Sequence, residues 1–171
     1  MILNLGCGLK KKEGWVNADI NPSAGPDVLM DMDAAHLPFR DNVFHQVICD
    51  NVIEHLGDVL GVMEEIHRVC SHRAVVEIYT PHFSSDDAYT DITHRHYFGY
   101  RSFHIFEEGK SQFHYYTKAK YRILWTRIHF GRLWRGAGIE YLANKFPSFY
   151  ESHWAFIFRA HQLSLHLEVL K

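Results

Sequence analysis

Short apolar runs alternate with turns through the first half of the chain. Five runs have the length and composition of buried strands, and they cover residues 1–5, 16–20, 27–32, 44–49 and 74–79. Between 58 and 69 apolar residues recur at helical spacing, with charged residues largely on the other face, which predicts an amphipathic helix. Strands that alternate with helix or loop in this way predict an α/β fold with a mostly parallel sheet.

The second half has a less regular pattern. Residues 82–117 are rich in His, Asp, Tyr and Phe without a clean period, and we interpret them as loops with one short helix. Residues 118–130 and 160–170 alternate apolar and polar positions, so both are predicted strands. The aromatic residues within 141–158 are interpreted as core packing in preference to a dimer face.

The composition is that of one globular domain. With 171 residues, 47% hydrophobic and 22% charged, the chain can bury one full core but is short for two. No apolar run approaches the roughly 18–20 residues that span a bilayer, and the N-terminus lacks a signal-peptide pattern. We therefore expect a cytoplasmic protein without membrane contacts.

Charge divides the chain into two parts. Residues 1–95 carry a net charge of about −8 and residues 96–171 one of about +6, although the whole chain carries only −2. Of the 25 aromatic residues, 19 lie in the second part. This asymmetry predicts different roles for the two halves of a single domain.

A glycine turn and a set of acids mark a ligand site. Gly6-x-Gly8 ends the first predicted strand, and two residues without Cβ allow the backbone to approach a ligand closely. Acidic residues stand at the ends of the next three strands, namely Asp19, Asp31, Asp33 and Asp50. The carboxyl ends of parallel strands form one edge of a sheet, where such folds bind ligands.

These segments resemble the class I S-adenosylmethionine-dependent methyltransferases. Leu3–Gly8 is similar to the glycine motif of that family, and Asn17–Ile20 to the segment with its ribose-binding acid. Residues 37–49 resemble the family's third loop and fourth strand, and 51–56 the opening of the following helix. The likeness extends over about residues 2–82 and identifies the chain as a small member that consists of the methyltransferase domain alone.

The resemblance implies a Rossmann-like fold with an antiparallel last strand, and S-adenosylmethionine as cofactor. Residues 1–81 would form the cofactor half, and 82–171 would bind the acceptor and complete the sheet. The glycines would pass under the methionine part, Asp19 would hold the ribose, and Asp31 would accept from the adenine amine. The residues implied at the cofactor are Leu5, Gly6, Cys7, Gly8, Asp19, Ile20, Asp31, Met32, Asp33, Asp50 and Asn51.

One departure from the family concerns its first helix. Only seven residues separate Gly8 from Val16, so that helix is expected to be missing or reduced to a turn. A sheet face left thinly covered would expose the cofactor or require another subunit, which makes a homodimer an open alternative. A nicotinamide oxidoreductase is disfavoured, because Lys11 stands where its third glycine would be needed.

The loop after the fifth strand is the predicted acceptor site. Methyl transfer needs alignment above all, but an oxygen or nitrogen acceptor must also lose a proton. His82, Asp91 and His94 are the candidate bases, against the alternative of a solvated surface loop. The same three residues with His96 could form a metal site, but without a helical His-x-x-x-His pair we expect no metal.

Segment 110–135 combines seven Lys and Arg residues with interleaved aromatic residues and contains no acid. This pattern is typical of a surface that binds an anionic acceptor or a nucleic-acid strand. It is equally typical of a solvated edge strand whose Lys and Arg residues prevent pairing with another strand. The near-neutral isoelectric point of 6.7 disfavours a dedicated nucleic-acid binder. The sequence thus predicts methyl transfer to a small-molecule or glycan-type acceptor, with a hydroxyl slightly favoured. The alternatives are a nucleic-acid methyltransferase and a non-catalytic cofactor-binding protein.

Overall fold

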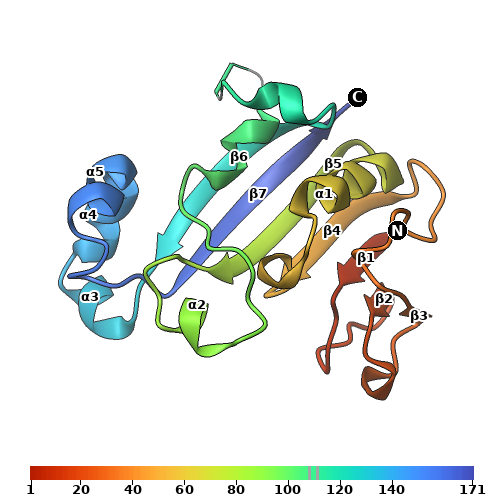
Figure 1. Cartoon of the computed structure of the whole chain (residues 1–171), viewed down its shortest axis with the longest axis horizontal. Coiled ribbons are helices and arrows are strands. Elements are labelled where there is room, and N and C mark those ends of the chain that lie inside the picture. The colour runs from red at the N-terminus through yellow and green to blue at the C-terminus, as the bar shows by residue number, and fades with distance from the viewer. Residues whose placement is uncertain (108, 111) are drawn as a thin grey trace.

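A mixed sheet of seven strands forms the centre of the protein (Figure 1). The computed structural model describes residues 1–107, 109–110 and 112–171. The strand order is β3-β2-β1-β4-β5-β7-β6, and β7 runs antiparallel to both of its neighbours. The strands are β1 (Ile2–Leu5), β2 (Val16–Asp19), β3 (Val28–Leu29), β4 (Phe44–Asp50), β5 (Cys70–Pro81), β6 (Lys120–His129) and β7 (Gln162–Leu170). The predicted Rossmann-like fold with an antiparallel last strand is confirmed.

The described helices are short apart from α1. They are α1 (Val59–Val69), α2 (Asp87–Thr90), α3 (Arg132–Gly136), α4 (Ile139–Lys145) and α5 (Pro147–His153). Single 3-10 turns lie at η1 (Pro22–Ala24), η2 (Ile53–His55), η3 (Ser102–Phe106) and η4 (His114–Tyr116). No helix in the described part of the chain is long and apolar enough to cross a membrane.

Helix α1 anchors the core. Its N-cap, Asp58, accepts a hydrogen bond from the Gly61 N–H at 2.9 Å, and its last residue leads directly into β5. The apolar stripe of the helix, including Met63 and Ile66, is fully buried. The hydroxyl of Tyr121 on β6 donates to the Met63 carbonyl at 2.7 Å, which ties the helix to the far edge of the sheet.

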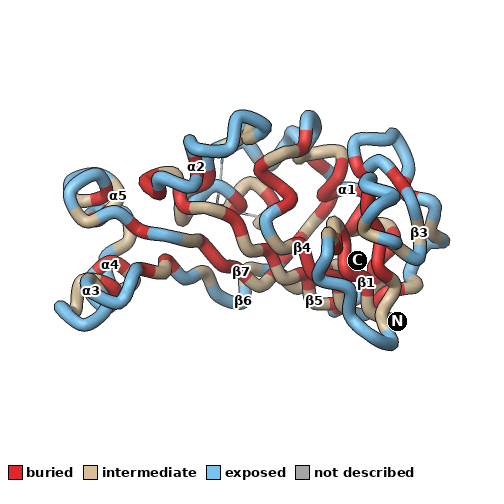
Figure 2. The backbone as a smooth tube through the Cα atoms, turned by 90° about the horizontal axis from the view of Figure 1, so that it is seen from below, coloured by how far each residue is buried: buried red, intermediate tan, exposed pale blue. Residues whose placement is uncertain are grey.

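The expected loss of the first helix is confirmed. Residues 6–15, all of them described, form turns between β1 and β2. In Figure 2, α1 and α2 lie on the same side of the strands. Along β5, buried Val76 and Ile78 alternate with half-buried Glu77 and Tyr79, so only one sheet face is fully packed.

Polar side chains cover the other face. Glu77 on β5 accepts a hydrogen bond from Gln46 on β4 at 2.6 Å and another from Tyr79 at 3.0 Å. On the neighbouring strands, the rings of Trp125 and His166 stack with centroids 4.0 Å apart. This face can therefore be exposed to water, although in most α/β sheets of this kind a helix packs against it.

The prediction of core packing for 141–158 is wrong for most of its large side chains. Tyr141, Phe146 and Phe156 are 66%, 54% and 67% exposed, whereas Tyr150 is buried. The reason is that α3, α4 and α5, which follow β6 and precede β7 in the sequence, form a lobe beyond the end of the sheet (Figure 1). Three helices of five to seven residues cannot bury all their apolar faces against one another.

A buried carboxylate fastens the loop before β4 to α1. Glu65 on α1 accepts the Leu37 N–H at 2.8 Å and two hydrogen bonds from Arg68 at 2.7 and 2.8 Å. Arg68 also donates to the carbonyls of Leu37 and Phe39. The hydrogen bonds from Arg68, followed by the one from Leu37, lower the pKa of Glu65 to about 2.

We expect Glu65→Gln to lower the free energy of unfolding by about 2 kcal/mol at pH 7, since hydrogen bonds to a charged group are lost. The carboxylate stabilises the fold above its unfolded pKa of 4.5, and this contribution is lost as pH falls toward 2. Urea unfolding should therefore show that the difference in free energy of unfolding between the native protein and Glu65→Gln becomes smaller below pH 4.5. A difference that is constant with pH, or an equal loss in the exposed control Glu13→Gln, would contradict this assignment.

Candidate functional site

The turn after β1 makes part of the backbone accessible to a ligand. Gly6 and Gly8 adopt left-handed conformations with φ of +70° and +47°. A Cβ on Gly6 would lie 2.2 Å from Cγ2 of Val52, so no other residue fits there without displacement. A Cβ on Gly8 would meet no atom within 4 Å, which leaves the backbone at this position accessible.

Asp19 at the end of β2 holds this turn. One carboxylate oxygen accepts the Gly8 N–H at 2.7 Å, and the other accepts the Asn21 N–H at 2.8 Å. The preceding residue, Ala18, accepts from the N–H groups of Gly6 and Cys7. The predicted acid thus lies directly at the predicted glycine turn.

A cavity of about 470 Å³ opens at this edge of the sheet. Its lining residues are Gly6, Gly8, Asp19, Ile20, Asp31, Met32, Asp33, Asn51, Val52, His55, Leu56 and Arg95. Eight of the eleven residues implied at the cofactor are among them. Leu5 and Cys7 are buried and do not line this cavity.

The two aspartates after β3 have different surroundings. The carboxylate of Asp33 accepts the Gly57 N–H with both oxygens, at 2.8 and 2.9 Å, and lies 3.8 Å from the guanidinium of Arg95. It therefore fastens one wall of the cavity to the start of α1. Asp31 is exposed, and among the described residues its carboxylate accepts only the local N–H of Asp33, at 2.9 Å, so most of its hydrogen-bonding capacity is available to a ligand.

A second cavity, of about 320 Å³, adjoins the first. Its lining residues are Asn51, Glu54, His55, Pro81, Asp87, Thr90, Asp91, His94, His161 and Gln162. Asn51 and His55 line both cavities. Asn51 also has a φ of +53°, which is rare for a residue with a side chain and common at functional turns.

Asp50 lies away from both of these cavities. Its carboxylate forms an ion pair with Lys10 at 3.0 Å and lines a third cavity on the open sheet face, together with Glu77 and Tyr79. Asn51 reaches this third cavity as well. The end of β4 is thus the point where the three cavities meet.

The three predicted bases are not together. Asp91 and His94 line the second cavity, whereas His82 does not. The His82 ring is fully buried, with Nδ1 at 2.9 Å from the Ser84 hydroxyl and Nε2 at 3.3 Å from the Glu151 carboxylate. Hydrogen bonds from Thr93 lower the pKa of Asp91.

Sequence reasoning missed Glu54 and His55 as site residues. Glu54 is only 1% exposed; one of its oxygens accepts the Thr80 hydroxyl at 3.1 Å, and burial raises the pKa of its carboxyl group. Its other oxygen, Oε1, is buried without a hydrogen-bond partner in the described structure. The signal lies in the 51–56 segment, whose resemblance to the family indicates the opening of a helix but assigns no role to these two side chains.

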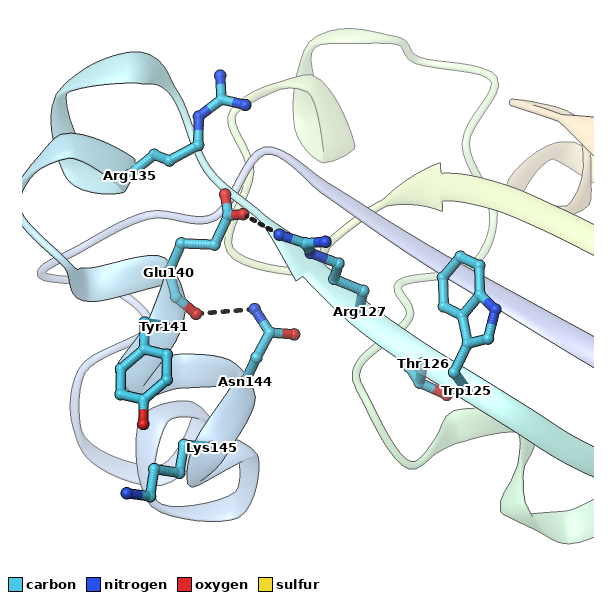
Figure 3. A pocket seen from close by; sticks show the side chains of 8 residues that line it. All are labelled: Trp125, Thr126, Arg127, Arg135, Glu140, Tyr141, Asn144 and Lys145. Atoms are coloured by element: carbon cyan, nitrogen blue, oxygen red, sulfur yellow. Dashed lines mark hydrogen bonds and ion pairs between the residues drawn. The ribbon is translucent and has the colours of Figure 1, made fainter.

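Segment 110–135 forms part of a separate cavity of about 770 Å³ between β6 and α4 (Figure 3). Ser111 of this segment lies outside the described residues. Figure 3 shows the Glu140 side chain pointing toward Arg127, and their ion pair measures 2.9 Å. Arg122 is paired with Glu168 at 3.2 Å. The segment is therefore partly neutralised by its neighbours.

The first cavity fits the cofactor that the sequence implied. Its volume is in the range of small-molecule sites, about 300–1,000 Å³. It combines an accessible backbone at Gly8, carboxylates at Asp19 and Asp31, and an apolar side chain at Met32. This set offers acceptors for ribose hydroxyls and an adenine amine, and an apolar contact for the base.

Comparison with known proteins agrees with the geometry of the first cavity. Residues 3–77 match a family model described as a methyltransferase domain. No curated protein matches the chain by sequence.

Several solved structures share the fold. A SAM-dependent methyltransferase from Archaeoglobus fulgidus is 14% identical with a TM-score of 0.66, over 98% of this chain and 85% of that one. One from Mesorhizobium loti is 14% identical with a TM-score of 0.58, over 98% and 89%. The [4+2]-cyclase SpnF is 12% identical with a TM-score of 0.61, over 99% and 74%.

The glycine turn, the acids at successive strand ends, the sheet order and the matched family model all lead to one assignment. Residues 3–77 form a class I methyltransferase domain, and the chain shares the fold of S-adenosylmethionine-dependent methyltransferases, which implies S-adenosylmethionine as its cofactor.

Proposed function

We propose that this protein transfers a methyl group from S-adenosylmethionine to a hydroxyl of a small-molecule or glycan-type acceptor. The observation that carries the proposal is the contact between the first two cavities at Asn51 and His55. A ligand in the second cavity would lie beside one in the first. The second cavity, at about 320 Å³, suits a small acceptor better than a polymer.

The cofactor would lie along the first cavity. Gly6 and Gly8 would face its methionine part, Asp19 would accept from the ribose hydroxyls, and Asp31 from the adenine amine. We assign Asp33 a supporting role, because Gly57 already occupies both of its oxygens. Asn51 would lie near the methionine end, where the cavities join.

The cofactor supplies an electrophilic methyl group on a sulfonium. Asp91 or His94 would take the proton of the acceptor hydroxyl as its oxygen forms the new C–O bond, and the electron pair of the C–S bond would remain with the cofactor's sulfur. Most of the rate acceleration would come from holding the hydroxyl in line with the methyl group. We assign His82 a positioning role, because its buried ring links Ser84 to Glu151 away from the cavity.

The charges around the second cavity favour a neutral, hydroxyl-rich acceptor. Its lining includes three carboxylates, Glu54, Asp87 and Asp91, beside three imidazoles. An anionic acceptor would be repelled by the carboxylates. The nucleic-acid alternative is weaker, since Arg122 and Arg127 are already paired with Glu168 and Glu140.

We expect isothermal titration calorimetry to detect S-adenosylmethionine binding by the native protein and at least tenfold weaker binding by Asp31→Ala. This loss of affinity is what we expect from removing one hydrogen bond between the adenine amine and the charged carboxylate of Asp31. The variant should keep its melting temperature, because the Asp31 side chain makes a single local hydrogen bond in the part of the chain that the structure describes. The exposed control Glu13→Ala, which lines none of the three cavities, should bind normally. Undetectable binding by the folded native protein would refute the proposal.

Thr90 allows the acceptor cavity to be tested separately. It is exposed and lines the second cavity but not the first, so Thr90→Trp should fill the acceptor space alone. With an acceptor found by screening hydroxylated small molecules and sugars, we expect at least a tenfold fall in S-adenosylhomocysteine release. The dissociation constant for S-adenosylmethionine should stay within about twofold. Full activity of this variant would place the acceptor elsewhere.

A further inference from the structure

Three side chains of types that bind metals, Glu54, His55 and His94, converge in the lining of the second cavity, and His55 lines the first cavity as well. Glu54 and His55 come from η2, and His94 comes from the loop after α2. One candidate ligand atom from each lies within 4.8 Å of those of the other two. The rings of His55 and His94 are 4.6 Å apart and inclined at 66°.

Glu54 brings a carboxylate oxygen that lacks a partner. The residue is 1% exposed, and its Oε1 has no hydrogen bond in the described structure. A buried polar atom in this state is unfavourable unless something else satisfies it. A cation between Glu54 and the two imidazoles would do so.

Within the described residues, both histidines form their ring hydrogen bonds through Nδ1, and neither Nε2 has a hydrogen bond. His94 Nδ1 lies 3.1 Å from the Ala88 carbonyl, which can only accept, so Nδ1 carries the proton. His55 Nδ1 lies 2.9 Å from the Thr93 hydroxyl, and that hydroxyl donates to Asp91 at 2.7 Å. The Thr93 oxygen therefore accepts from His55 Nδ1–H. In the neutral rings Nε2 then has a lone pair for a metal, as in other metal-bound histidines.

The backbone holds the cluster in place. The N–H groups of Arg95 and His96 both donate to the Glu54 carbonyl, at 2.8 and 3.2 Å. These bonds fix the residue after His94 directly against Glu54. The ligands therefore come from two segments that are already joined before any ion binds.

We propose that Glu54, His55 and His94 bind a divalent transition metal whose open positions face the acceptor cavity. Two imidazoles and one carboxylate are a ligand set typical of Zn²⁺, Mn²⁺, Co²⁺ or Fe²⁺. The sequence analysis expects no metal, and the set it considers, His82, Asp91, His94 and His96, shares only His94 with this cluster. His82 is held instead by Ser84 and Glu151.

The role of this metal rests on the proposed function. A hydroxyl of the acceptor would take an open position on the ion, next to the cofactor cavity. A bound cation makes such a hydroxyl more acidic and fixes its direction. His94 would then act as a ligand, which leaves Asp91 to take the proton. Both hydrogen bonds from Thr93 go to Asp91 Oδ1, so Oδ2 would be the accepting atom.

The test is a titration of the purified, chelator-treated protein with Co²⁺, followed by visible absorption, and with Zn²⁺, followed by calorimetry. We expect one ion per chain and d–d bands typical of mixed nitrogen and oxygen ligands. His94→Gln and His55→Gln should each weaken binding at least tenfold, and both side chains are partly exposed, so folding should be kept. Glu54→Gln tests the buried oxygen, with circular dichroism to confirm the fold.

His161→Gln is the matched control. His161 lines the same cavity but is paired with Asp87 and lies outside the cluster, so its loss should leave Co²⁺ affinity unchanged. Thr93→Val should weaken binding about tenfold by releasing His55 Nδ1. Absence of binding at millimolar Co²⁺ and Zn²⁺, or equal binding by the native protein and both histidine variants, would overturn the proposal.

The two proposals can fail separately. Metal binding is measured without S-adenosylmethionine, and cofactor binding is measured in chelator. A protein that binds the cofactor but no metal would refute only the metal site. A protein that binds the metal but not the cofactor would refute the proposed transferase.

Discussion

The close approach of the Gly6 turn to Val52 sets the geometry of the whole site. Only a residue without Cβ fits at Gly6, because a Cβ would lie 2.2 Å from the Val52 side chain. The left-handed backbone of Asn51 turns the chain after β4 so that η2 begins beside that glycine. This one contact brings the cofactor turn, and the carboxylate and imidazole of η2, to the same edge of the sheet.

The open face of the sheet is the second constraint on the molecule. With residues 6–15 reduced to turns, the face opposite α1 lacks the apolar layer that a longer first helix would provide. The chain compensates with side chains that hydrogen-bond along the sheet, such as Gln46 to Glu77. These hydrogen bonds explain how a mostly parallel sheet remains stable with one face exposed to water. On the same face, Asp50 and Lys10 form an ion pair in the lining of the third cavity.

Much of the fold could be predicted because periodicity reports burial directly. The strands from Ile2 to Leu5 and from Gln162 to Leu170 alternate or fill with apolar residues because their faces are packed. The lobe of α3, α4 and α5 could not be predicted in this way. Its aromatic residues lack the neighbours that would bury them, so their apolar character misled the assignment to the core.

The same distinction holds within the candidate site. The acids at strand ends were predictable, because parallel strands end at one edge of the sheet. The environment of each acid could not be predicted, because it depends on contacts between residues far apart in sequence. Asp33 accepts a hydrogen bond from Gly57, 24 residues away, and Asp50 accepts one from Lys10, 40 residues away. Glu54 stands in a recognisable motif, but only the folded chain shows that one of its oxygens is buried without a partner.

The fold alone does not decide the chemistry of this protein. A [4+2]-cyclase shares it with a TM-score of 0.61, so the glycine turn and the acids around the first cavity leave the reaction open. The reaction must instead depend on what the second cavity holds beside Asn51. There the chain places three carboxylates and three imidazoles around about 320 Å³, with both ring Nδ1 atoms of the His55–His94 pair already engaged. A site for an apolar reactant alone would gain nothing from Glu54, because its carboxylate is 1% exposed and costs free energy unless it meets a polar or charged ligand.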